Sequence, residues 1–110
     1  TGEVKQFLKD LDLIGWHSIP ISKIHGDLVS QNVIYTDTQE FFPFDWEYCR
    51  TDIIFYDAWL YIYDLHGQER MTSDVDFYRD FELVINVFNI SVHDIRALHR
   101  LLKFLRRPYI

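Results

Sequence analysis

The sequence predicts one α+β domain in which helices predominate and a small β-hairpin carries the polar loops. Four segments show helical periodicity or helix-boundary residues, and two short β-branched and aromatic segments flank a polar turn. A length of 110 residues suits a single domain. Apolar residues make up 48% of the chain and aromatic residues 17%, which excludes a disordered tail and predicts an aromatic-rich core or interface.

The first half of the chain is expected to form a helix, a short strand and a hairpin. Gly15 closes the helix, whose apolar residues recur at helical spacing: Val4, Phe7, Leu8, Leu11 and Ile14. A strand over 21–24 leads into the polar segment that begins at His25. Strands over 32–35 and 40–44 flank a polar turn and therefore predict the hairpin.

The second half is expected to contain a polar loop over residues 46–52 and three helices, over residues 53–66, 73–88 and 91–105. The first of these helices is apolar all round, so it is expected to be buried, and to end at Gly67. Ser73 and Ser91 are the expected N-caps of the next two helices. Pro108 is expected to stop the last one.

Charge and cysteine content exclude several classes of protein. The formal net charge of −6 argues against a generic nucleic-acid partner. The basic residues near the end of the chain are expected on a solvated helix face: Arg100, Lys103, Arg106 and Arg107. One cysteine, Cys49, excludes an internal disulfide and fits a reducing, cytoplasmic compartment.

No secretory signal or membrane span is expected. Asp57 and Asp64 interrupt the longest apolar run, which is too short to cross a bilayer. The chain starts at Thr1 directly with an amphipathic segment instead of a signal peptide. This abrupt start predicts that the sequence is a piece of a longer protein.

Three polar side chains are expected to meet beside the hairpin. Asp27 lies one loop ahead of Asn32, and Asp45 follows the second hairpin strand. Because a hairpin brings these strand ends to one side, Asn32 and Asp45 are expected to share a divalent cation. Phosphoryl transfer to a hydroxyl needs such a set: one carboxylate to accept the proton, and an amide and a carboxylate to hold the metal on the phosphates.

Taken one at a time, these residues indicate little, because Asp and Asn in loops usually serve as turn or capping residues. The combination is more informative. His25 stands two residues before Asp27, Leu28 follows it, and Asn32 lies five residues beyond. This spacing is the kinase catalytic-loop pattern, and Asp45 stands where that pattern has its metal-binding Asp.

Three further residues are candidates for supporting roles. The ring of His25 is expected to hydrogen-bond backbone and fix its loop, with a catalytic role as the alternative. Glu47 is either a metal or substrate contact or a solvated acid. Asp57 lies in a strongly apolar segment, so it is expected to anchor the backbone of the loop.

Four aromatic residues admit two interpretations: Trp46, Trp59, Tyr61 and Tyr63. They are either the walls of a cage for a cationic substrate or ordinary core residues, and the core is favoured. The remaining histidines show no ligand spacing typical of zinc: His17, His66, His93 and His99.

The segment His25-Gly26-Asp27-Leu28-Val29-Ser30-Gln31-Asn32 resembles the catalytic loop, His-Gly-Asp-Leu-x-x-x-Asn, of the aminoglycoside phosphotransferase and choline kinase superfamily. These are small-molecule kinases with a protein-kinase-like fold. Phe44-Asp45-Trp46-Glu47-Tyr48 is similar to their metal-binding segment, and Tyr56-Asp57 falls at the usual spacing of their downstream Asp. Thr51-Asp52-Ile53-Ile54 departs from the family's Gly-Asp-Pro.

The resemblance covers the C-terminal lobe only. The chain shows no glycine-rich phosphate loop and no strand with the lysine that grips ATP, and its four glycines are scattered. The resemblance therefore implies that residues 1–110 are a kinase-like C-lobe fragment whose N-lobe lies upstream in a longer protein or has been lost. A fragment of this kind is expected to have little or no kinase activity alone.

By resemblance, Asp27 is the catalytic base, Asn32 and Asp45 bind Mg²⁺ and hence the ATP phosphates, and Asp57 supports the loop. The implied activity is ATP-dependent phosphorylation of a small-molecule hydroxyl, with an aminoglycoside, choline, ethanolamine or a sugar as acceptor. The acidic site favours a cationic acceptor. Two alternatives stay open: a catalytically silent kinase-like module that binds a partner, and a structural helical domain with an accidental match.

Overall fold

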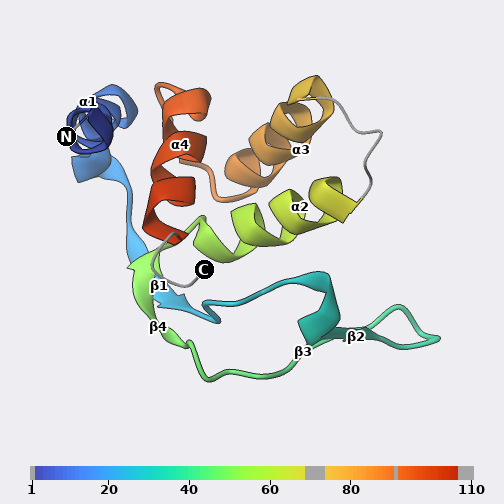
Figure 1. The fold of residues 1–110 in the computed structure, drawn as a ribbon. Helices are drawn as coiled ribbons and strands as arrows, with labels where there is room; N and C mark the ends of the chain where they lie inside the picture. Colours follow the sequence, from blue (N-terminus) through green and yellow to red (C-terminus); the bar gives the residue numbers. More distant parts are fainter. Residues whose placement is uncertain (1, 69–73, 91, 107–110) are drawn as a thin grey trace.

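The computed structural model describes residues 2–68, 74–90 and 92–106 (Figure 1). These residues form an α+β structure with four α-helices and a β-hairpin, as the sequence predicts, and a second small antiparallel sheet that it does not predict. The elements are α1 (Gly2–Ile14), β1 (Ile21–Ile24), β2 (Val33–Tyr35), β3 (Phe41–Pro43), β4 (Arg50–Ile53), α2 (Tyr56–Gln68), α3 (Asp74–Val87) and α4 (Ile95–Arg106). Within the described ranges, every helix is too short or too polar to cross a membrane.

The core lies among α2, α3 and α4, which Figure 1 shows grouped on one side of the molecule. Each helix contributes buried apolar side chains, and Phe55 adds one directly before α2: Tyr56, Trp59 and Leu60 in α2, Phe77, Phe81 and Ile85 in α3, and Ala97, Leu98, Leu101 and Leu102 in α4. Full burial of one large apolar side chain is worth roughly 1.5–3 kcal/mol. The packing of these three helices therefore fixes the position of α2, on which the candidate site depends.

The first helix ends as the sequence predicts. Gly15 adopts a left-handed conformation (φ 65°), and its N–H donates to the carbonyl of Asp12. The contact of α1 with α4 corrects one prediction. Arg100 is not a purely solvated residue, because its guanidinium donates to the carboxylate of Asp10, which is 1% exposed (Nη2 to Oδ1, 2.9 Å). These hydrogen bonds raise the pKa of Arg100 above its ordinary value.

The predicted hairpin is present, with narrower bounds than expected. β2 pairs antiparallel with β3, Val33 opposite Pro43 and Tyr35 opposite Phe41. Burial and the neighbouring hydroxyl of Tyr35 raise the pKa of Tyr61 on α2 to about 12. Phe41 also contacts the Tyr61 ring, so the hairpin lies against the outer face of α2 (Figure 1).

The prediction of a polar loop over 46–52 is wrong for its last three residues. Arg50, Thr51 and Asp52 belong to β4, which pairs antiparallel with β1 in the register Ile21 opposite Ile53 and Ile24 opposite Arg50. These three residues lack the alternation of apolar and polar side chains that marks a strand. The strand instead depends on a partner strand 26 residues away at the Ile24–Arg50 pair (50 − 24 = 26) and 32 residues away at the Ile21–Ile53 pair (53 − 21 = 32).

The helix boundaries differ from the predictions at the first residues of α2 and α4 and at the end of α2. The prediction that this helix ends at Gly67 is wrong: Gly67 does not adopt the left-handed conformation that ends a helix, and α2 continues to Gln68. α2 begins at Tyr56, three residues later than expected, because Ile53 ends β4. Ser73, Ser91 and Pro108 lie outside the described residues. The cap of α4 is Asp94, whose Oδ1 accepts hydrogen bonds from the N–H groups of Arg96 and Ala97 (3.1 and 3.0 Å).

Candidate functional site

Asp27 and Asn32 lie together at the two ends of a short loop. The amide Nδ2 of Asn32 donates to the carbonyl oxygen of Asp27 (2.9 Å) and to its carboxylate Oδ2 (3.1 Å). Asn32 is 8% exposed, whereas Asp27 is half-buried. These bonds use only the amide nitrogen, so Oδ1 of Asn32, the atom of an amide that binds cations, is not committed to Asp27.

His25 connects this loop to the segment that precedes Asp45. Its Nδ1 accepts a hydrogen bond from the backbone N–H of Asp27 (3.1 Å), so this nitrogen carries no proton. The proton is therefore on Nε2, which donates to the carbonyl oxygen of Phe44 (2.7 Å). The ring makes the backbone contacts expected of it, and these contacts require the neutral imidazole.

Phe44 brings Asp45 beside the loop. Its N–H donates to the carbonyl oxygen of Asn32 (2.9 Å), while its own carbonyl oxygen accepts from His25. Asp45 follows directly, with an exposed side chain and a left-handed backbone (φ 62°). Residues with a side chain adopt this conformation at a cost and are concentrated in turns and at functional sites.

Two carboxylates of α2 hold the loop at both ends. Asp57 accepts hydrogen bonds from the backbone N–H groups of His25 (Oδ2, 2.7 Å) and Gly26 (Oδ1, 2.9 Å). Asp64 accepts from the N–H and the hydroxyl of Ser30 (3.0 and 3.1 Å). The backbone bonds of Asp57 are those expected from its place in an apolar segment. Asp64 was missed, although its position seven residues after Asp57 puts both on one helix face.

Replacement of Gly26 by any other residue would force the local backbone to move. Its φ is +92°, and a Cβ at this position would collide with the carbonyl of Tyr48 and approach Arg50 Nη1 to 2.7 Å. Arg50 in turn donates to the carbonyl oxygen of Tyr48 (3.2 Å), pairs with Asp52 (Nε to Oδ2, 3.0 Å) and lies over the ring of Tyr56. The segments that contain Asp27 and Asp45 are thus in direct contact. Sequence reasoning did not identify Arg50, because nothing in its neighbours marks it.

The donor set fits a metal that is bound partly by phosphate. Among the described residues there is no group of three or more His, Cys, Asp or Glu side chains suited to holding a metal ion. Asn32 and Asp45 offer two oxygen donors from neighbouring segments. Mg²⁺ is commonly held by one or two carboxylates together with water and substrate phosphates. Binding of magnesium by Asn32 and Asp45 stays a prediction.

Glu47 and Trp46 complete the segment after Asp45. Glu47 is exposed, and its role as a metal or substrate contact stays a prediction. Trp46 is about half exposed, and its indole lies against the ring of His25, with the ring centroids 4.5 Å apart. Cys49 N–H donates to the carbonyl of Trp46, which closes a turn here.

The four aromatic residues considered for a cationic cage pack in separate groups. Trp59 is fully buried and stacks on Tyr63 (centroids 5.2 Å apart) beside His99. Tyr61 instead faces the hairpin, and Trp46 covers His25. The structure therefore does not bring these four side chains together as one cage, and the core interpretation is right for Trp59.

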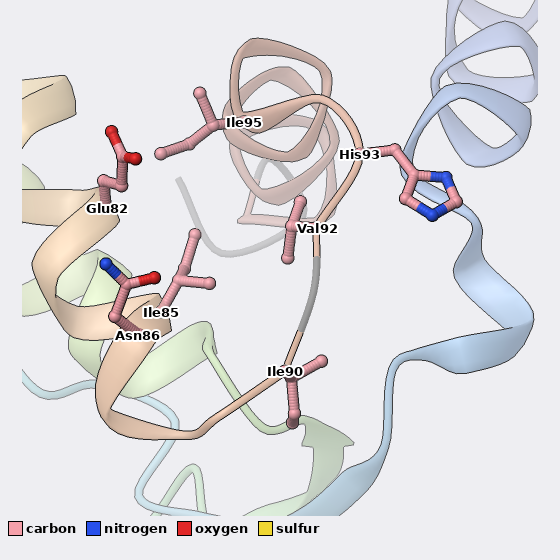
Figure 2. A pocket seen from close by; sticks show the side chains of 7 residues that line it. All are labelled: Glu82, Ile85, Asn86, Ile90, Val92, His93 and Ile95. Atoms are coloured by element: carbon pink, nitrogen blue, oxygen red, sulfur yellow. The ribbon is translucent and has the colours of Figure 1, made fainter.

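A small hollow of about 280 Å³ lies away from this loop, between the end of α3 and the start of α4. Figure 2 shows Ile85, Val92 and Ile95 around it, whereas His93 points away toward the end of α1. The His93 ring lies against Gly15, where a Cβ would approach it to 3.3 Å. Glu82 and Asn86 of α3 also line the hollow, so its walls are partly polar.

Comparison of the chain with protein-family models, curated proteins and solved structures gave no match. The kinase interpretation therefore depends on the motifs and on the geometry of the loop.

Proposed function

We propose that this chain is the C-terminal catalytic portion of an ATP- and Mg²⁺-dependent phosphotransferase that acts on a small-molecule hydroxyl. One observation carries the proposal: Asp27 and Asn32 are hydrogen-bonded to each other on a loop that is held at both ends, with Asp45 one residue beyond a backbone contact with that loop. Such an arrangement provides a proton acceptor and two metal ligands from adjacent segments.

In this proposal Asp27 orients the acceptor hydroxyl and accepts its proton. The Oδ1 atom of Asn32 and the carboxylate of Asp45 hold magnesium, which neutralises charge on the transferred phosphoryl group when it is bound. His25 contributes by position: its two hydrogen bonds fix the Asp27 backbone relative to the segment that carries Asp45. Catalysis of this kind consists mainly of positioning and electrostatic stabilisation.

The charge of the site favours a cationic acceptor. Asp27, Asp45 and Glu47 belong to neighbouring segments, and the magnesium ion is expected to balance part of their charge. Aminoglycosides, choline and ethanolamine are hydroxyl compounds that carry positive charge, and a neutral sugar is the remaining class. The parts that grip ATP are expected in an N-lobe upstream of this segment.

The test is phosphoryl transfer by the full-length protein from radiolabelled ATP with Mg²⁺ to kanamycin, choline, ethanolamine and glucose. Asp27→Asn is expected to lower turnover by about three orders of magnitude or more, because it removes the proton acceptor and keeps the shape. Asp37→Asn, in the exposed hairpin turn, is the matched control and is expected to keep full activity. Near-normal turnover of Asp27→Asn would remove Asp27 from this role.

A catalytically silent binding module is the second candidate, and the hairpin favours it. Large apolar side chains of the hairpin and the following residue are each at least 40% exposed: Ile34, Tyr35, Phe41, Phe42 and Phe44. An apolar surface of this kind commonly marks an interface. Calorimetric titration of the full-length protein with ATP and Mg²⁺ separates the two candidates. Absence of both magnesium-dependent ATP binding and transfer favours the binding module.

A further inference from the structure

A cavity of about 530 Å³ lies between the end of α2, the start of α3 and the face of α4 that meets them. Its volume is in the range typical of small-molecule sites, roughly 300–1,000 Å³. None of its lining residues belongs to the candidate phosphotransferase site. It is therefore a separate feature of the helical part of the molecule.

Three aromatic rings form the apolar walls of this cavity. Tyr63 of α2 and Phe77 of α3 meet edge to face, with centroids 6.1 Å apart, and Phe77 meets Tyr78 in the same way at 5.3 Å. All three surround the imidazole of His99, at centroid distances of 5.6, 4.6 and 5.5 Å. Rings held by one another in this way present fixed, flat walls that suit a planar ligand.

His99 offers a hydrogen-bond donor to the cavity. The indole N–H of Trp59 donates to its Nδ1 (2.8 Å), so the ring proton is on Nε2. Burial, which is the largest cause, and the charges of Lys103 and Arg100 together lower the pKa of His99 from its ordinary value of 6.5 to about 4, against the opposing effect of Asp74. At pH 7 the ring is neutral and donates through Nε2 alone.

Lys103 gives the cavity a cationic group that an anion can contact. Arg100 and Lys103 lie one helical turn apart on α4, and both line the cavity. Arg100 is balanced by Asp10, and its Nε and Nη2 atoms are used in that pair. The Lys103 ammonium lies 5.8 Å from the centroid of the Tyr63 ring, at the aromatic wall itself. Asp74 lines the cavity from α3, so with Arg100 paired to Asp10 the lining has one further cation, Lys103, and one acid.

We propose that this cavity binds a small planar aromatic carboxylate. The ring of the ligand lies against Tyr63 and Tyr78, beside the imidazole of His99, and its carboxylate accepts hydrogen bonds from the Lys103 ammonium and from His99 Nε2. This pairing combines apolar contact with a small number of placed polar groups, which is the usual composition of a ligand site. A charge-assisted bond to Lys103 is the part of the site that distinguishes a carboxylate from a neutral compound.

The experiment uses 1-naphthoate as the probe and its uncharged amide, 1-naphthamide, as the matched compound, at pH 7. Binding is followed by NMR through the ring protons of His99, assigned with His99→Gln. The naphthoate is expected to bind with a Kd below about 1 mM and about tenfold or more tightly than the amide, and to shift the His99 signals. Lys103→Gln is expected to weaken naphthoate binding about fivefold or more and to leave binding of the amide unchanged.

The control variant is Lys9→Gln, which removes an exposed lysine of α1, outside the cavity, and is expected to bind naphthoate normally. Lys103 is itself exposed, so its replacement is not expected to affect folding. Equal affinities for the acid and the amide, unchanged binding by Lys103→Gln, or naphthoate binding that leaves His99 unshifted would each overturn the proposal. Binding without a shift of the His99 signals would indicate that naphthoate binds outside the cavity, for example to the exposed hairpin.

Discussion

Replacement of Asp57 by alanine is expected to destabilise the protein and to release the loop that carries Asp27. The carboxylate of Asp57 accepts two backbone hydrogen bonds, from His25 and Gly26, and both of these residues are buried. Its removal leaves two buried N–H groups without a partner. A buried donor left in this state costs about 1–3 kcal/mol. Two such donors, partly relieved by entry of water, give an expected loss of about 3 kcal/mol in the free energy of unfolding.

Asp57→Asn separates the acceptor role from side-chain volume. The amide has the shape of the carboxylate, but it has one acceptor oxygen, and its NH₂ group faces the second N–H. One hydrogen bond is lost and a donor–donor contact is formed, so a loss of about 2 kcal/mol is expected. Asp37→Ala, in the exposed turn of the hairpin, is the control and is expected to change stability by less than about 0.5 kcal/mol.

The measurement is urea unfolding of the three variants, followed by circular dichroism, together with amide hydrogen exchange of the native state. In the parent protein the amides of His25 and Gly26 are expected to be protected, and in Asp57→Ala they are expected to exchange rapidly while amides of α3 stay protected. The reasoning is refuted if Asp57→Ala is no less stable than Asp37→Ala. It is also refuted if the two amides keep their protection in the alanine variant.

Three further perturbations have expected outcomes. Gly26→Ala is expected to lower the free energy of unfolding by about 3 kcal/mol or more, because the φ of Gly26 is +92° and the added Cβ collides with the backbone. Gly67→Ala is expected to raise the free energy of unfolding by about 0.5–1 kcal/mol, because Gly67 lies in a helix with open space around it. Denaturant unfolding of both variants checks these two values. Arg100→Met leaves the carboxylate of Asp10 buried without its cation and is expected to cost about 2 kcal/mol, less than a fully buried pair because Arg100 is itself partly exposed; a loss below 0.5 kcal/mol contradicts it. The pKa of His99 is lower in the folded protein than in the unfolded chain, so protonation of His99 destabilises the fold. The free energy of unfolding is therefore expected to be highest above pH 6.5 and to fall by about 1–2 kcal/mol as the pH falls toward 4, after allowance for the partial exposure of His99. Urea unfolding between pH 7 and pH 4 is expected to show this loss in the parent protein and a smaller one in His99→Gln.

The sequence predicts those elements whose cause is local. The apolar spacing before Gly15 defines α1, and the polar turn between two short apolar segments defines the hairpin. Each of these signals spans fewer than about 15 residues, so it can be recognised without the rest of the fold. The start of α4 was missed by a few residues for a different reason. Several residues of the segment before it are potential N-caps, and only the geometry identifies Asp94.

Elements that depend on distant partners were harder to predict. β4 has a polar sequence, and its pairing with β1 is set by where the loop and α2 place the chain. Arg100 reads as a surface residue on its own helix, and its partner Asp10 is 90 residues away. In both cases the favourable interaction arises only after the chain has folded, so no window of sequence around either residue contains it.

The candidate site depends both on a local sequence motif and on packing between distant parts of the chain, and this determines how the site is to be tested. The motif supplies the residue types at 27, 32 and 45, whereas the geometry of the loop comes from α2 through Asp57 and Asp64. α2 is positioned by a core that includes Trp59, on the other side of the helix from the hairpin. A variant that weakens this core therefore also changes the spacing of the loop. Loss of activity assigns a chemical role only when the variant, like Asp27→Asn, keeps the shape of the side chain and leaves the anchors on α2 in place.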